Sequence, residues 1–269
     1  MPQHGTAQVD AGSGVLVGHG SPRKRHILHE NFSKAPILND SWVPTTVDPT
    51  IAEFAIIFRG NENFQLMGTN AADANSIPDA GGGISLTTAG ADADQLAIVP
   101  QQDSNFSSWG TATFGGADEV CFEWLIELPS ALTDYIVFGG LSDDAVIDAT
   151  FVAAEDDDSI LIVFDDGVNS GKWQLQYSIG GTDYTVDLGV APVASTHYGF
   201  QIKIDADGYA DIYVSQGLSE FTHRHKTKNP VVVTSSHIDF IPRVGIEAQA
   251  AAAKNLNVRY AAISKAYNN

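Results

Sequence analysis

The chain has 269 residues, of which 43% are hydrophobic, enough for one large β domain with a well-formed core. Its 14 Lys and Arg residues against 33 Asp and Glu residues give a formal net charge of −19. A surface this acidic repels nucleic acid and anionic lipid, so we expect neither nucleic acid nor a membrane as a partner. With 25 Gly, 11 Pro and no long run of helical periodicity, the composition favours strands and turns.

The N-terminal segment differs from the rest of the chain. It is rich in Gly and Ser and shows little periodicity, which is typical of chain outside a folded core. We therefore divide the chain into an extended N-terminal arm, residues 1–45, and a β-sandwich body, residues 46–269. The arm can lie along neighbouring subunits or fold back over its own domain. Its first residues show no signal peptide, so we expect synthesis in the cytoplasm of the producing cell, with either retention there or release by a route that uses no such signal.

The densest positive patch of this acidic chain lies in the arm. It fits an electrostatic contact with an acidic surface better than a nucleic-acid site, because it is short and isolated. We predict that the docking contacts of the arm come from four consecutive residues: Arg23, Lys24, Arg25 and His26. A second basic cluster, His223 to Lys228, is expected in a loop.

From residue 51 onward, short apolar or alternating segments follow one another, each ended by turn residues. The most regular is 119–128, EVCFEWLIEL, where Val120, Phe122 and Trp124 share one face with Ile126 and Leu128. The expected strands are 51–58, 64–66, 84–86, 96–99, 107–114, 119–128, 135–141, 159–164, 173–179, 184–188, 197–204, 209–214, 238–248 and 256–262.

The clearest hairpin is HYGFQIKIDADGYADIYV, residues 197–214. Two alternating segments flank a turn in which Gly208 is free to adopt positive φ. Because no long helix separates the strands, parallel crossovers are excluded and the sheets are expected to be antiparallel. The predicted fold is all-β, an antiparallel two-sheet jelly-roll β-sandwich.

The segment 119–141, this hairpin and the closing strand NLNVRYAAISKAY together resemble the concanavalin-like lectin and glucanase sandwiches, over about residues 50 to 269. Within that likeness, GGGISLTTAGADADQLAIVPQ followed by EVCFEWLIEL and FGGLSDD is similar to the jelly-roll proteins of tailed-phage virions. The resemblance implies a subunit on the surface of a phage head.

Catalysis is not expected at the carboxylates of the central strand. Glu123 and Glu127 share a face, as in the glucanase motif, but Leu125 stands where that family has Asp. Four strand residues also separate the two glutamates by about 13 Å, too far for the carboxyl pair of a retaining enzyme. The expected role of the two is a solvated or interface-facing row. Cys121 is expected to be a structural thiol.

No metal site or cofactor is predicted. Asp-rich loops at 156–158, 165–166 and 205–207 are better explained as turns than as calcium loops, because none continues to the required Glu. The eight His residues complete no zinc pattern, and no phosphate-binding or nucleophile-elbow motif is present.

We therefore predict a non-enzymatic virion structural protein. It would decorate and stabilise the capsid, docking through its arm on the major capsid protein and on sister copies, as a homo-oligomer on the virion surface. The alternative is a carbohydrate-binding, lectin-like module or adhesin, with a glycan as ligand. That alternative needs exposed aromatic residues on one sheet, and the candidates are Trp109, Trp173, Tyr209 and Tyr213. Of these, Trp173 is expected to pack in the core.

Overall fold

The structure is a computed structural model, and it describes residues 25–30, 37–38, 64–68, 75–78, 83–100, 119–142, 158–231 and 240–266. These residues form two eight-stranded sheets, and every pair of neighbouring strands is antiparallel except one. The exception is the short parallel pair β2 (Ile37–Leu38) and β3 (Phe64–Gly68). The predicted antiparallel two-sheet sandwich is confirmed.

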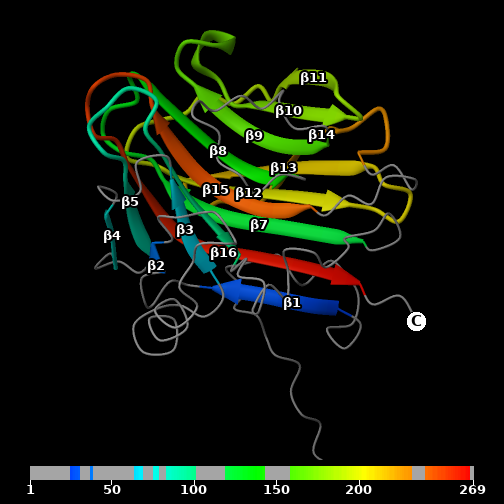
Figure 1. Cartoon of the computed structure of the whole chain (residues 1–269). Coiled ribbons are helices and arrows are strands. Elements are labelled where there is room, and N and C mark those ends of the chain that lie inside the picture. The colour runs from blue at the N-terminus through cyan, green and yellow to red at the C-terminus, as the bar shows by residue number, and fades with distance from the viewer. Residues whose placement is uncertain are drawn as a thin grey trace, which may run out of the picture.

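Sheet A contains the most regular strand of the sequence, β7, near its middle (Figure 1). Its strand order is β14 (Thr222–Lys226), β13 (Ala210–Gln216), β12 (His197–Ile204), β7 (Val120–Glu127), β16 (Asn255–Ala266), β5 (Ile84–Thr87) and β4 (Asn75–Pro78). The remaining strand, β1 (Arg25–Glu30), pairs with the C-terminal half of β16, so that the first and last strands lie side by side.

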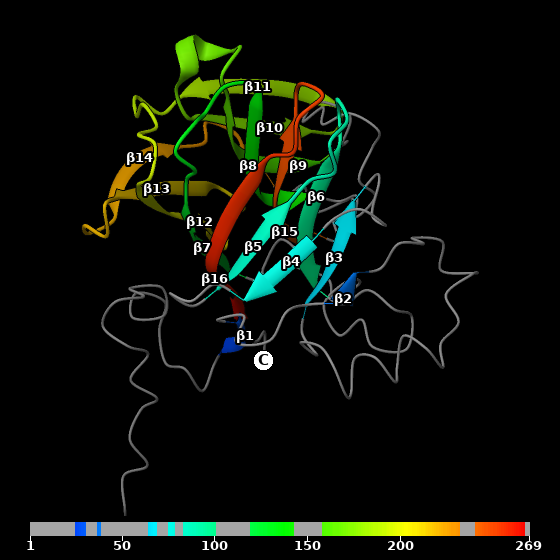
Figure 2. The same cartoon turned by 90° about the vertical axis from the view of Figure 1, so that its left-hand side faces the viewer.

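Sheet B has β8 and β15 at its centre. Its order is β11 (Thr182–Asp187), β10 (Gln174–Ile179), β9 (Ser159–Asp165), β8 (Tyr135–Ser142), β15 (Ile241–Ala248), β6 (Gln95–Pro100), β3 and β2. A short 3-10 turn, η3 (Asn169–Gly171), connects β9 to β10. In the view of Figure 2, β12, β13 and β14 of sheet A lie on the left and β3 and β6 of sheet B lie on the right.

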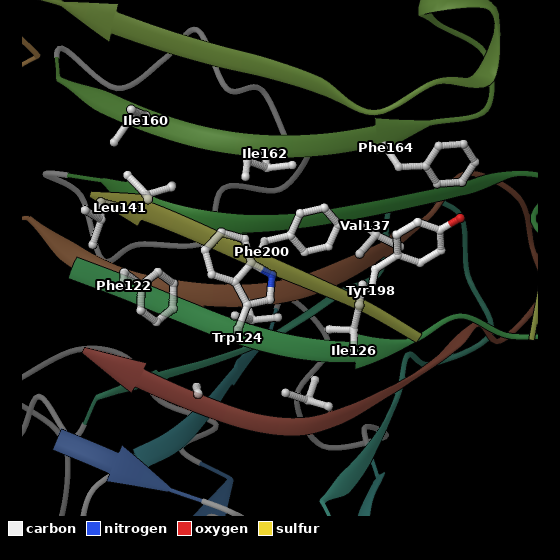
Figure 3. Packing of buried hydrophobic residues seen from close by; sticks show 14 of the residues in the cluster. Phe122, Trp124, Ile126, Val137, Leu141, Ile160, Ile162, Phe164, Tyr198 and Phe200 are labelled. Atoms are coloured by element: carbon white, nitrogen blue, oxygen red, sulfur yellow. The ribbon is translucent and has the colours of Figure 1, made fainter. Parts of the chain in front are cut away.

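The core lies between the sheets, where the alternating apolar faces meet (Figure 3). Phe200 of β12 stacks on Trp124 of β7, with 5.4 Å between ring centroids, and meets the edge of Trp173 at 4.6 Å. The Trp124 indole reaches across to Gly139 of β8, where an added Cβ atom would lie 2.6 Å from Cε2. A larger residue at this position would therefore force the indole or the backbone to shift.

Two segments that the sequence does not predict as strands form strands in the structure. Within the predicted arm, the six residues of β1 pair with β16 in sheet A, and Ile37 and Leu38 form β2 in sheet B. The basic cluster 223–228, expected in a loop, instead contributes most of β14, the edge strand of sheet A.

The strands expected at 51–58 and 107–114 lie outside the described residues. Within the described chain, no helix is long and apolar enough to cross a bilayer.

Candidate functional site on the outer face of sheet A

The outer face of sheet A is the side turned away from sheet B. The even-numbered residues of β7 and β12 lie in the core, so their odd-numbered neighbours point the other way. Strand register aligns these outward residues in rows, because directly paired residues project from the same face. Tyr213, Gln201 and Glu123 form one row across β13, β12 and β7. The next row contains Asp211, Lys203 and Cys121.

Glu123 lies at the centre of this face and is 0% exposed. The Gln201 amide donates a hydrogen bond to its Oε2 at 2.6 Å, and the Tyr260 hydroxyl donates one to its Oε1. Burial raises the pKa of Glu123 to about 8, because these two hydrogen bonds and the more distant Lys203 only partly offset the loss of hydration. The carboxyl group is therefore mainly protonated at neutral pH. The solvated alternative expected from the sequence is therefore wrong for Glu123, and the interface-facing alternative stays a prediction.

A second group on the outer face surrounds the Tyr213 ring, which is partly exposed. The Lys203 ammonium lies 4.6 Å from the ring centroid, and the His223 ring meets it edge-on at 5.1 Å. The His223 Nε2 atom is 2.8 Å from Asp211 Oδ1. Burial, together with the Asp211 charge, raises the pKa of the Tyr213 phenol, so this hydroxyl stays protonated and can donate a hydrogen bond.

Lys226 of β14 links the hairpin turn to the same face. Its Nζ atom lies 2.9 Å from Asp205 Oδ2, 3.5 Å from Asp211 Oδ2 and 5.5 Å from the Tyr209 ring centroid. The Asp205 hydrogen bond raises the pKa of Lys226 above its ordinary value. Lys226 therefore pairs with two carboxylates and lies beside a second partly exposed tyrosine.

Asp205 fills the turn role that the sequence predicted for it. Its Oδ1 atom accepts hydrogen bonds from the backbone amides of Tyr209 at 2.9 Å and Asp207 at 3.1 Å, while Gly208 has φ +84°. Burial acts to raise the pKa of Asp205, but the Lys226 and Tyr209 hydrogen bonds outweigh it and the pKa is lowered. Among the described residues, no three His, Cys, Asp or Glu side chains gather in a way that could hold a metal ion.

The far end of β7 carries an ion-pair cluster. Glu127 pairs with Arg259 of β16, and His197 Nε2 lies 3.8 Å from the same carboxylate oxygen. Glu127 and Glu123 therefore have separate partners and separate environments. They do not form the close carboxyl pair that retaining glycoside hydrolysis requires.

The aromatic candidates for glycan contact differ in how far their side chains are exposed. Trp173 is 1% exposed and packs against Phe164, Tyr198 and Phe200, so its expected core position is confirmed and it is excluded as a surface contact. Tyr209 and Tyr213 are partly exposed, and Tyr213 points outward from sheet A. Trp109 lies outside the described residues. Cys121 is buried, in agreement with a structural thiol.

The predicted docking residues of the arm are described only in part. Arg23 and Lys24 lie outside the described residues. Arg25 and His26 begin β1, where they pair in register with Ala266 and Lys265. The polar partners around Tyr213 were missed by the sequence, although the alternation of β12 and β13 already placed Lys203, Asp211 and Tyr213 on one face.

No protein-family model and no curated protein matches this chain. Several solved structures do match the chain. A protein of unknown function from Shewanella oneidensis MR-1 superposes with a TM-score of 0.56 at 12% identity, over 90% of this chain and 87% of that one. The carbohydrate recognition domain of Emp47p gives 0.53 at 11% identity, over 93% of this chain and all (100%) of that one.

Winged bean acidic lectin, solved with methyl-α-D-galactose, gives a TM-score of 0.51 at 8% identity, over 91% of this chain and 100% of that one. Identities this low show a likeness of fold alone. The chain has the concanavalin-like β-sandwich fold of the legume-type lectins, as its sequence pattern implied.

Proposed function

We propose that this protein is a carbohydrate-binding module whose ligand lies on the outer face of sheet A over β12, β13 and β14. The observation that carries the proposal is the pair of partly exposed tyrosines, Tyr209 and Tyr213, set among charged hydrogen-bonding groups. Ligand sites typically combine aromatic surface with a few placed polar groups. Tyrosine suits a sugar in particular, because it offers an apolar ring and a hydroxyl on one rigid side chain.

The polar groups beside Tyr213 are fixed before any ligand arrives. Asp211 bonds to His223 and pairs with Lys226, so these side chains need little reordering on binding. Preorganised groups lose less conformational entropy when a ligand binds, which favours affinity. The lectin-type fold supports the same proposal, since the carbohydrate recognition domain of Emp47p and winged bean acidic lectin share the architecture.

A glycan array with the full chain tests the proposal. We expect binding by the native protein and about a tenfold or greater loss in Tyr213→Ala, which removes the ring at the centre of the group. Tyr184→Ala, the same change on β11 of sheet B, is the matched control and should bind as the native protein does. An array without a bound glycan, or equal losses in both variants, would contradict the proposal.

The role on a phage capsid stays a prediction beside this proposal. It requires that Arg23, Lys24, Arg25 and His26 contact a major capsid protein or a sister copy, on the surface of a virion. Loading of the full chain and of a chain lacking residues 1–24 onto capsids tests it, because this deletion keeps β1 in sheet A. Equal loading would contradict docking through Arg23 and Lys24.

A further inference from the structure

The outer face around Tyr213 differs in charge from the rest of the molecule. Residues 203–228 contain four of the 14 Lys and Arg residues and four of the 33 Asp and Glu residues, so this segment is neutral. The remaining ten cationic and 29 acidic residues account for the whole net charge of −19. By charge alone, this segment repels an anionic ligand less than the chain as a whole does.

Two of the four acidic side chains of this segment, Asp205 and Asp211, have partners at the outer face, and the other two, Asp207 and Glu220, are exposed. Asp205 accepts two backbone amides and pairs with Lys226, and Asp211 contacts both Lys226 and His223. Glu123, in the row beside Lys203, is buried and mainly protonated at neutral pH. Asp205 and Asp211 therefore share the positive charge of Lys226, and Glu123 adds little negative potential to the surface above Tyr213.

Lys203 and Arg224 of the same segment form no ion pair with a carboxylate among the described residues. The Lys203 ammonium is held over the Tyr213 ring at 4.6 Å, and no ion pair to it is formed within the described part of the chain. Arg224 is exposed on β14, at the irregularity in register between Ile212 and Tyr213, and it is likewise unpaired among the residues that the structure describes. Both lie on the strands that flank Tyr213.

We propose that the glycan taken at this face is acidic, a saccharide containing uronic acid residues, with Lys203 and Arg224 receiving the carboxylates beside the Tyr213 ring. This inference rests on the proposed carbohydrate-binding function and specifies its ligand class. The cation over an aromatic ring is stabilised by the ring and stays partly exposed. A sugar that contacts Tyr213 through its ring brings a carboxylate at C5 within reach of that cation.

The probes are oligomers of galacturonic acid, of mannuronic and guluronic acid, and of glucuronic acid, each compared with its own methyl ester. Esterification removes the charge and keeps the sugar. We expect binding of an acid form, at least tenfold weaker binding of its ester, and further weakening as NaCl is raised from about 50 to 500 mM. Lys203→Gln should weaken binding of the acid form about fivefold and leave binding of the ester unchanged. Lys172→Gln removes a charge at the end of η3, between β9 and β10 of sheet B, and should change neither.

The outcomes separate this inference from the function on which it rests. Equal binding of acid and ester, or a Lys203→Gln variant that binds the acid form normally, overturns the acidic ligand and leaves a carbohydrate-binding module. Binding of neutral glycans on the array with no binding of any uronate does the same. The absence of binding to acidic and neutral glycans alike overturns both.

Discussion

The buried carboxyl group of Glu123 makes the stability of this protein depend on pH in a predictable direction. Its pKa rises from 4.5 in the unfolded chain to about 8 in the folded one. The folded state therefore holds this proton more tightly, so the contribution to the free energy of unfolding is complete below about pH 4.5 and is lost as the pH rises through 8. Over those 3.5 pH units the loss amounts to about 5 kcal/mol, at about 1.4 kcal/mol per unit.

Glu123→Gln isolates this effect. A glutamine has the same shape as the protonated acid, and it can accept the Gln201 hydrogen bond and donate to the Tyr260 hydroxyl oxygen. We expect the variant and the native protein to unfold at similar urea concentrations at pH 5. At pH 8.5 the variant should be more stable, by up to about 5 kcal/mol, because it has no proton to lose.

The measurement is urea unfolding followed by circular dichroism at half-unit steps from pH 5 to 9. Glu220→Gln, the same change on an exposed residue, should run parallel to the native protein. A constant difference between the Glu123→Gln variant and the native protein across this range would refute a raised pKa. A large loss in the variant already at pH 5 would show that the site needs the acid itself and not its shape.

Two further perturbations test the packing and the hairpin. Gly139→Ala places a methyl group against the Trp124 indole, so the free energy of unfolding should fall by about 1–3 kcal/mol in urea titrations, and an unchanged midpoint would show that the indole moves aside. Asp205→Ala removes the acceptor of the Tyr209 and Asp207 amides and the Lys226 partner, so the thermal midpoint should fall by an amount equivalent to about 1–2 kcal/mol. Asp207→Ala, at the exposed tip of the same turn, should have little effect by comparison, and equal shifts would contradict the role given to Asp205.

The sequence was informative wherever one face of a strand is apolar. The alternation in 119–128 and 197–214 placed β7, β12 and β13 within one or two residues of their observed ends. The same alternation assigned Phe122, Trp124 and Phe200 to the core. These strands pack one face against the opposite sheet, so their side-chain periodicity carries the signal.

β14 had no such signal. Its sequence, THRHK, has no apolar residue, and it forms a strand because it pairs with the edge of β13. Charged residues on an edge strand are common, since they discourage pairing with other chains. The basic cluster predicted as a loop therefore forms most of an edge strand, because it pairs with β13.

The environment of Glu123 could not be predicted from its neighbours in the chain. Alternation correctly predicts that it lies on the face opposite the core, but it does not predict that this position is buried. Its two partners, Gln201 and Tyr260, are 78 and 137 residues away in sequence. Their approach depends on β12 and β16 flanking β7, a topology that no local pattern encodes.

The position of β16 has a consequence for how the protein is made. This last strand pairs with β7 along one side and with β5 and then β1 along the other, so it holds three strands of sheet A together. A chain emerging from the ribosome has no such strand until residues 255–266 have been made, long after β7. Sheet A therefore cannot close until then, and in the meantime β7 presents an unpaired edge that a chaperone could protect.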